Sequence, residues 1–133
     1  MTALLESRTI SVSIERDPKD VYEFVSTPTN LAKWASGLGT SVENLNGEWI
    51  ARTPQGAVRF KFAEQNDYGV LDHYVSPAPG VVLYVPMRVI PNGKGSELIF
   101  TLFRLPDMSD EKFAEDTAWV ERDLTALKNL LEA

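Results

Sequence analysis

Residues 109–132 read SDEKFAEDTAWVERDLTALKNLLE, a stretch that contains neither Gly nor Pro. Ser109 is a favourable helix N-cap, and Asp110 and Glu111 suit the positive end of a helix dipole. After these residues, small or apolar side chains recur every three or four positions, at Phe113, Thr117, Val120, Leu124, Leu127 and Leu131. This spacing predicts a long helix with one narrow apolar stripe that faces a partner.

Two kinds of partner could cover this stripe. Heptad spacing is typical of a coiled-coil dimer, but the stripe spans only about three heptads and includes Thr117. We therefore expect the stripe to pack against a β-sheet of the same chain.

The sheet is predicted by segments in which apolar and polar residues alternate and by further segments that turn residues separate. From Arg8 to Ile14, apolar residues alternate with polar ones, as in a strand with one buried face. Turn residues at short intervals separate six further segments, which favours an antiparallel meander. These expected strands are Thr40–Leu45, Glu48–Thr53, Ala57–Gln65, Val70–Ser76, Val81–Pro91 and Ser96–Leu105.

Two short helices are expected between the first and second strands. Asp17-Pro18 and Thr27-Pro28 each place an N-cap residue before a Pro at the first helical position. Apolar residues follow at helical spacing, namely Val21, Phe24 and Val25 after the first pair and Leu31, Trp34 and Ala35 after the second. Gly37 and Gly39 then end the second helix.

This order of elements predicts an α+β fold. Crossover helices between the strands are missing, which excludes a parallel doubly wound sheet. We expect one seven-stranded antiparallel sheet wrapped around the C-terminal helix, which is about 36 Å long at 1.5 Å per residue. Pro86 lies inside the longest strand and cannot donate to a ladder, so we expect a bulge or an unpaired stretch there.

Composition limits the classes of function. The 133 residues, 44% hydrophobic and 24% charged, are typical of one globular domain, which we place at 1–133. Without Cys and with a single His, we expect no metal and no cofactor. The net charge of −6 disfavours nucleic acid as a partner. No segment suits a signal peptide or membrane insertion, so we expect a cytoplasmic protein.

Three stretches resemble a known family. Residues 70–75 (VLDHYV), 85–93 (VPMRVIPNG) and 116–128 are similar to small bacterial proteins of the polyketide cyclase/dehydrase type. These proteins belong to the START-like or SRPBCC superfamily, and the order of elements resembles its helix-grip fold. The resemblance implies a pocket between the sheet and the C-terminal helix that receives an apolar or amphipathic small molecule. Members of the superfamily include lipid carriers, cyclases, hormone receptors and chaperone activators.

Strand pairing predicts which side chains face such a pocket. A turn at residues 92–95 gives three inward-facing pairs, Val89 with Leu98, Met87 with Phe100 and Val85 with Leu102. Arg88 falls on the opposite face, where Glu97 is close enough for a diagonal ion pair.

His73 is the only side chain whose ordinary pKa lies near neutrality, so it is the candidate catalytic acid or base. Two strand registers give it different orientations. The turn before His73 pairs it with Phe62 and directs it inward, whereas the turn after it pairs Tyr74 with Leu83 and directs Tyr74 inward. The two registers require a bulge, and we favour His73 inward because its neighbours on that face are apolar.

Large apolar side chains gather on the elements expected around the pocket. Trp34, Trp49 and Trp119 lie on the second short helix, an early strand and the final helix, and such side chains suit a core or a flat apolar ligand. The candidate ligand-binding residues are Trp34, Trp49, Phe60, Phe62, His73, Tyr74, Met87, Phe100, Trp119 and Val120.

Three functions follow, in order of preference. The first is binding of a hydrophobic or amphipathic small molecule, lipid-like or polyketide-like, by a monomer or homodimer. The second is a cyclase/dehydrase-like enzyme with His73 as acid or base and Tyr74 or Arg52 as an oxygen-binding group. The third is a protein-interaction domain similar to the chaperone-activating relatives.

Overall fold

The structure of the chain is a computed structural model that describes residues 4–35, 41–53 and 56–133. Its elements are β1 (Ser7–Ile14), α1 (Pro18–Val25), η1 (Pro28–Asn30), α2 (Leu31–Trp34), β2 (Ser41–Leu45), β3 (Glu48–Thr53), β4 (Gly56–Phe62), β5 (His73–Ala78), β6 (Val81–Val85), β7 (Met87–Asn92), β8 (Gly95–Phe103) and α3 (Asp110–Glu132). This is the expected α+β order. The expected helix end at Gly37 and Gly39, the strand start at Thr40 and the turn at residues 54 and 55 lie outside the described residues.

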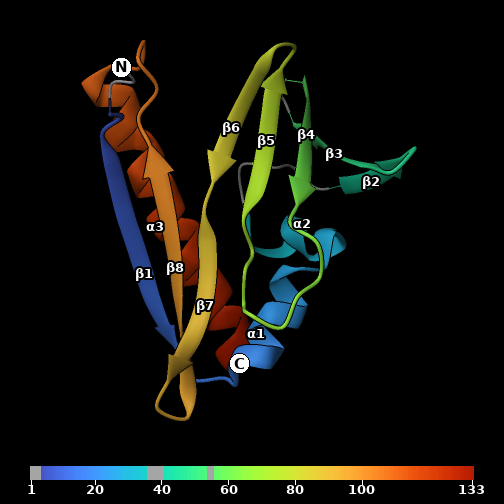
Figure 1. Cartoon of the computed structure of the whole chain (residues 1–133), viewed down its shortest axis with the longest axis vertical. Coiled ribbons are helices and arrows are strands. Elements are labelled where there is room, and N and C mark those ends of the chain that lie inside the picture. The colour runs from blue at the N-terminus through green and yellow to red at the C-terminus, as the bar shows by residue number, and fades with distance from the viewer. Residues whose placement is uncertain (1–3, 36–40, 54–55) are drawn as a thin grey trace.

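The strands form two antiparallel sheets, and the expectation of a single seven-stranded sheet is wrong. One sheet has the order β1-β8-β7 and the other has the order β2-β3-β4-β5-β6. The expected strand Val81–Pro91 is divided at Pro86 into β6 and β7, which belong to different sheets. Figure 1 shows β6 continuing into β7 as the chain passes between the sheets. The interruption expected at Pro86 is thus confirmed, and it separates the two sheets.

The side chain of Asp72 holds the chain at this break. Its Oδ1 accepts hydrogen bonds from the backbone N–H of Met87 (2.8 Å) and from Nε of Arg88 (3.1 Å). Its Oδ2 accepts from Nη2 of Arg88 (3.0 Å) and from the hydroxyl of Tyr84 (3.3 Å). The expected ion pair between Arg88 and Glu97 is therefore wrong, because Asp72 engages the guanidinium through both carboxylate oxygens. Paired charged hydrogen bonds of this kind are among the stronger ones in proteins.

The segment before β5 runs beside β7 and also links the two sheets. The N–H of Leu71 donates to the carbonyl of Met87 (2.8 Å), and the N–H of Val89 donates to the carbonyl of Gly69 (3.0 Å). Gly69 has φ of 70°, and a Cβ at this position would collide with the carbonyl oxygen of Val89. Glycine is therefore needed for the close approach of the two backbones.

The register around the β7–β8 turn agrees in part with the prediction. The structure confirms two of the three expected pairs, Met87 with Phe100 and Val89 with Leu98. Val85 belongs to β6 and lies opposite His73, so its expected pairing with Leu102 is wrong. The difference arises because Val85 precedes the break and Met87 follows it.

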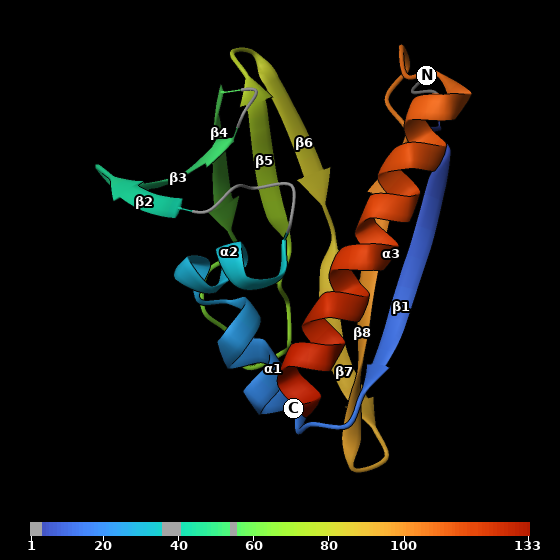
Figure 2. The same cartoon turned by 180° about the vertical axis from the view of Figure 1, so that it is seen from behind.

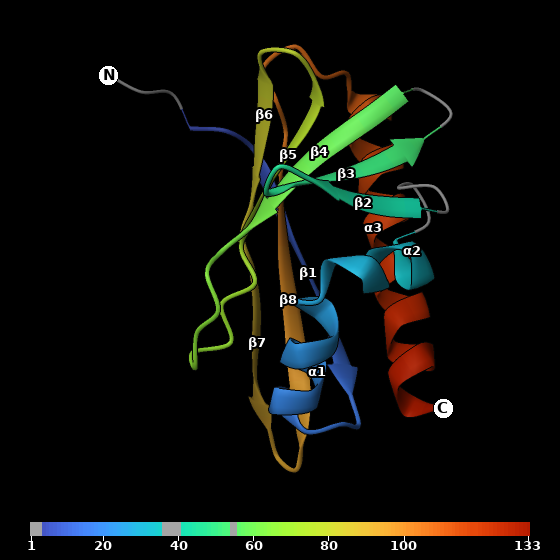
Figure 3. The same cartoon turned by 90° about the vertical axis from the view of Figure 1, so that its right-hand side faces the viewer.

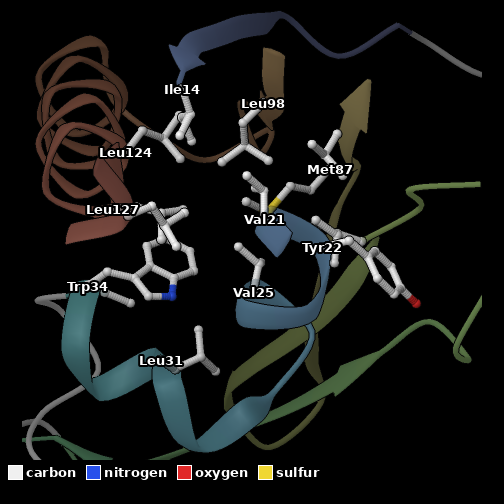
Figure 4. Close-up of a cluster of buried hydrophobic side chains, with 14 of the residues drawn as sticks. Ile14, Val21, Tyr22, Val25, Leu31, Trp34, Met87, Leu98, Leu124 and Leu127 are labelled. Carbon is white, nitrogen blue, oxygen red and sulfur yellow. The ribbon is translucent and has the colours of Figure 1, made fainter. Parts of the chain in front are cut away.

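The hydrophobic core fills one end of the molecule, where α1 contacts β7 and β8 and α2 contacts α3. Figure 4 shows side chains from these elements pointing toward one another. Each labelled residue is at most 9% exposed: Ile14, Val21, Tyr22, Val25, Leu31, Trp34, Met87, Leu98, Leu124 and Leu127. Asp17 begins α1 as expected, because its side chain accepts a hydrogen bond from the N–H of Lys19 (2.9 Å).

The apolar stripe of α3 is confirmed, but its middle is incompletely covered. Ser109 caps the helix by accepting from the N–H of Lys112 (3.1 Å). The buried residues of the stripe are Phe113, Leu124, Leu127 and Leu131. Between them, Thr117 and Val120 are only half-buried. Figure 2 shows α3 lying along β1, and α3 also contacts α2, so the stripe is covered from within the chain, as preferred over a coiled coil.

Asp72→Asn is expected to lower the free energy of unfolding by about 1 to 2 kcal/mol, because Met87 and Arg88 lose a charged acceptor. Hydrogen bonding from the Arg88 guanidinium holds the pKa of the Asp72 carboxyl below its ordinary value of 3.8. The stabilisation is therefore complete above the unfolded-state pKa and is lost as the pH falls through the lower folded-state pKa.

Denaturant unfolding across this acid range measures both effects. The wild-type protein and the Asp72→Asn variant should converge in stability at low pH. Asp67→Asn is the matched control, because Asp67 is exposed and has no hydrogen bond or ion pair among the described residues. Equal stability of the Asp72 variant and the wild type at pH 7 would contradict the role given to this carboxylate.

Candidate functional site

One face of the five-stranded sheet carries several of the predicted ligand-binding side chains. Strand register places Trp49 and Val75 opposite Phe60, and Phe62 opposite His73. Phe60 belongs to the core cluster, and Trp49, Phe62 and Val75 pack against it. We call this the inner face and define it by Trp49, Phe60, Phe62, His73 and Val75. Figure 3 shows β2, β3 and β4 of this sheet in front of α3.

The inner face is only partly closed by packing. Phe60 is 5% exposed. The other residues of the inner face, Trp49, Phe62, His73 and Val75, remain half-buried. Thr117 and Val120 on α3 and Phe100 on β8 share this intermediate exposure. The core is therefore packed at the C-terminal half of α3, and apolar side chains stay accessible near its N-terminal half.

His73 presents a neutral ring to the interior. Its Nδ1 lies 3.0 Å from the carbonyl oxygen of Leu71. Ring centroids of Phe62 and Phe100 lie 5.0 Å and 6.3 Å from that of His73, so the imidazole is held between aromatic side chains of both sheets. Burial lowers the pKa of His73 below its ordinary value of 6.5. The ring is therefore uncharged at pH 7.

The tautomer of His73 follows from this geometry. A carbonyl oxygen can only accept, so Nδ1 must carry the proton that it donates to Leu71. In a neutral ring, Nε2 then has a free lone pair. Among the described residues Nε2 has no hydrogen-bond partner. The site therefore offers one hydrogen-bond acceptor beside aromatic surface.

The structure resolves the two registers proposed for β5. The pairing of His73 with Phe62 is confirmed, and His73 points inward. The pairing of Tyr74 with Leu83 is wrong, because Leu83 lies opposite Val75. The pairing of β5 with β6 shifts register between Val75 and Ala78, and this irregularity makes the inward orientation of His73 compatible with the length of the β5–β6 turn. Tyr74 consequently lies on the opposite face from the inner residues.

Tyr74 and Arg52 therefore do not lie beside His73. Tyr74 is 49% exposed, and its ring centroid lies 5.4 Å from that of Tyr84 on the same outer face. Arg52 is an exposed side chain whose Nε lies 3.2 Å from a carboxylate oxygen of Glu43. Neither side chain shares a face with the imidazole, so the structure does not bring together the expected acid–base and oxygen-binding groups.

Three further candidates lie away from the inner face. Trp34 is 7% exposed in the core, and its indole N–H is buried with no hydrogen-bond partner. Met87, which is 0% exposed, lies in the same core. Trp119 is 38% exposed, with the guanidinium of Arg122 5.3 Å from its ring centroid. Of the three tryptophans, only Trp49 belongs to the inner face.

The prediction of site residues missed Val75 and Thr117. Val75 was recognisable as the next inward position after His73 in the same strand. Thr117 is the single polar residue of the α3 stripe, and its Oγ1 donates to the carbonyl of Phe113 (2.8 Å). A polar residue within an apolar stripe is the signal that could have identified it.

Other kinds of site are not seen in the described part of the chain. Residues 4–35, 41–53 and 56–133 contain no group of three or more acidic or His side chains placed to hold a metal ion. Within the same ranges, no helix has the length and apolar character needed to cross a membrane.

The NMR titration of His73, the only His, should have a midpoint below 6.5, because its charged form is disfavoured by burial. The ring ¹⁵N shifts should show a protonated Nδ1 and an unprotonated Nε2 at pH 7. Since the folded-state pKa is depressed, stability should also decrease as the pH falls below the unfolded-state value. A midpoint at or above the ordinary value would contradict the buried, neutral assignment.

Solved structures show the same fold. Protein XoxI from Bacillus cereus has a TM-score of 0.77 and 18% identity, over 96% of this chain and 96% of that one. The Aha1 dimer from Colwellia psychrerythraea has a TM-score of 0.75 and 16% identity, over 96% and 97% of the two chains. DynU16, from the dynemicin biosynthetic locus, has a TM-score of 0.73 and 16% identity, and the match covers 96% of this chain and 47% of that one.

Comparison of sequences identifies the family. No curated protein matches the chain. Residues 7–132 match the family described as polyketide cyclase / dehydrase and lipid transport. This match covers almost the whole chain, and the fold agrees with it in the antiparallel sheets around a long C-terminal helix and the short helices after β1. The chain is therefore a helix-grip protein of the SRPBCC type and belongs to the polyketide cyclase / dehydrase and lipid transport family.

Proposed function

We propose that the protein binds a hydrophobic or amphipathic small molecule on its inner face, beside the N-terminal half of α3. The observation that supports this proposal is the incomplete burial of apolar side chains on both sides of this region. Trp49, Phe62 and Val75 on the sheet and Val120 on the helix all remain half-buried while they pack against the core. The family description, which includes lipid transport, agrees with such a role.

Apolar burial would supply most of the binding free energy. Removing apolar surface from water is worth about 25 cal/mol per Å², so covering roughly 200 Å² would contribute about 5 kcal/mol before the cost of association. Rigid aromatic rings such as those of Trp49 and Phe62 give a large contact area with little loss of side-chain entropy. A flat or elongated apolar ligand suits this surface.

The polar groups beside this surface favour a ligand with a hydrogen-bond donor. His73 Nε2 has a free lone pair, and the Thr117 hydroxyl already donates its proton to Phe113 and can accept at its oxygen. Neither the inner-face residues nor Thr117 and Val120, the half-buried residues of the α3 stripe, include a Lys or Arg. An uncharged ligand with a hydroxyl group therefore fits better than a carboxylate.

Val120→Trp should weaken binding at least about 10-fold, because the larger side chain occupies the space beside the inner face. Leu130→Trp is the matched control, since Leu130 is on the same helix and is 42% exposed. Nile red fluorescence and displacement by a long-chain alcohol measure the affinity, and mass spectrometry of extracted protein identifies any ligand that co-purifies. Equal affinity of the Val120 variant and the wild type would refute the proposed location.

A cyclase or dehydrase activity is the second candidate, favoured by the neutral His73 with an unoccupied Nε2. Such a nitrogen can accept a proton from a bound substrate at pH 7. With a polyketide recovered by extraction as substrate, His73→Gln should abolish turnover and change the ligand dissociation constant by less than about 3-fold. Unaltered product formation by this variant would remove His73 from catalysis and leave the binding role intact.

A further inference from the structure

A groove follows an open edge of β4. Its volume is about 890 Å³, and the side chains that line it come from both faces of the five-stranded sheet. Trp49, Phe60 and Phe62 belong to the inner face, whereas Lys61 and Tyr74 lie on the outer one. The groove is therefore continuous with the inner face and reaches it around the edge of the strand. We call it the edge groove.

The edge is open because β4 extends beyond its pairing with β3. This pairing ends at Trp49 and Phe60, and β4 continues to Phe62, past the turn that joins β2 to β3 (Figure 3). Continuing the same register would place Gly47 of that turn opposite Phe62, but the Gly47 N–H donates to Oδ1 of Asn44 (3.0 Å). Within the described part of the chain, no strand therefore covers this side of Phe62.

The backbone of Phe62 presents a hydrogen-bond donor and an acceptor to this open edge. Successive residues of an antiparallel strand direct their N–H and C=O groups to alternate neighbours. The N–H of Ala63 donates to the carbonyl of Asp72 (2.8 Å), on the β5 side of the strand. The N–H and C=O of Phe62 consequently point away from β5, where no hydrogen bond joins them to Gly47 or to any other described residue. Both groups lie beside the aromatic surface of the edge groove.

We propose that the edge groove binds an uncharged N-acylated amino acid derivative, an apolar chain that carries one –NH–CHR–CO– unit. This assignment rests on the proposed function and adds the chemical class of the ligand. In an extended –NH–CHR–CO– unit the N–H and the C=O point to the same side, so both can pair with the C=O and N–H of Phe62, as in strand addition at a sheet edge. The acyl chain covers Trp49 and the ring of Phe62, which are both half-buried. The volume falls within the range of about 300 to 1,000 Å³ that is common for small-molecule sites.

Two matched ligands test this proposal by displacement of Nile red. One is N-octanoyl-L-alanine methyl ester, and the other is methyl O-octanoyl-L-lactate, in which an oxygen replaces the amide N–H. The alanine derivative should bind about 5-fold more tightly, because only it can donate a hydrogen bond to the Phe62 carbonyl. The lactate ester is the less polar compound, so apolar burial alone would not produce this order. Equal affinities, or tighter binding of the lactate ester, would overturn the proposal.

Hydrogen exchange measured by NMR locates the contact. In the free protein, the Phe62 N–H should exchange faster than the Phe60 N–H, because Phe60 lies opposite Trp49 within the ladder. Saturation with the alanine derivative should slow exchange at Phe62 at least about 10-fold and leave the amides of β1, which does not line the groove, unchanged. A Phe62 amide that is already protected in the free protein, or that exchanges at the same rate when the ligand is bound, would contradict the assignment.

A bulky substitution in the edge groove gives a second measurement. Ala63→Trp should weaken binding of the alanine derivative at least about 10-fold, because Ala63 is exposed and lines the groove. Ala118→Trp is the matched control at an exposed position of α3 that does not line the groove, and it should leave the affinity within about 2-fold of the wild type. Equal losses in the two variants would refute the location. Far-UV circular dichroism checks that both variants are folded.

The Val120→Trp variant distinguishes failure of this proposal from failure of the proposed function. It should weaken both ligands, whose acyl chains cover the inner face, and preserve the 5-fold ratio between them, because Val120 does not line the edge groove. Equal affinities of the two ligands, together with the expected loss of Nile red binding in this variant, would refute the contact with Phe62 and leave binding on the inner face intact. A 5-fold ratio together with unaltered Nile red binding would support the edge groove and refute the location beside α3.

Discussion

Asp72 contacts the backbone of Met87 and the guanidinium of Arg88. This contact stabilises the fold at Pro86, where the chain leaves the five-stranded sheet and enters the three-stranded one. Pro86 cannot donate a hydrogen bond, so the ladder between β6 and its neighbours cannot continue into β7 unaltered. The carboxylate supplies an acceptor for the first N–H after the proline and binds the following side chain as well. One half-buried carboxylate thus ties the end of one sheet to the beginning of the other.

This change of pairing divides the molecule into two regions with different packing. Beyond Pro86, β7 and β8 pack with α1 and the C-terminal half of α3, and the core there is buried. Before Pro86, aromatic side chains of the five-stranded sheet such as Phe62 keep part of their surface accessible. On α3, the half-buried Val120 lies at the boundary between the packed core and this more accessible region. The packed core and the proposed binding surface therefore lie beside different halves of the same helix.

Spacing and capping residues along the chain predicted most of the helices and strands. The division of the strands into two sheets could not be predicted, because it depends on contacts between residues far apart in sequence. The α3 stripe and the Asp17 cap depend on spacing along the chain, and both are confirmed. The interruption at Pro86 was also predictable, because it follows from one missing N–H. Its consequence for the sheets was not, since it depends on Asp72, which lies far away in sequence. The inward orientation of His73 and the need for a bulge were predicted from the two competing registers, but the place of the register shift, between Val75 and Ala78, was not.

At the junction between the sheets, the backbone runs directly from β6 into β7, but the ladder of hydrogen bonds between strands is interrupted. The junction is spanned instead by the hydrogen bonds of Leu71 with Met87 and of Val89 with Gly69, and by the contacts of Asp72 with Met87 and Arg88. Side-chain and irregular backbone contacts therefore replace the regular ladder at this point. The angle between the two sheets is thus fixed by a handful of contacts around one proline, and a substitution that removes those contacts would act on the relative orientation of the sheets without altering the side chains within either one.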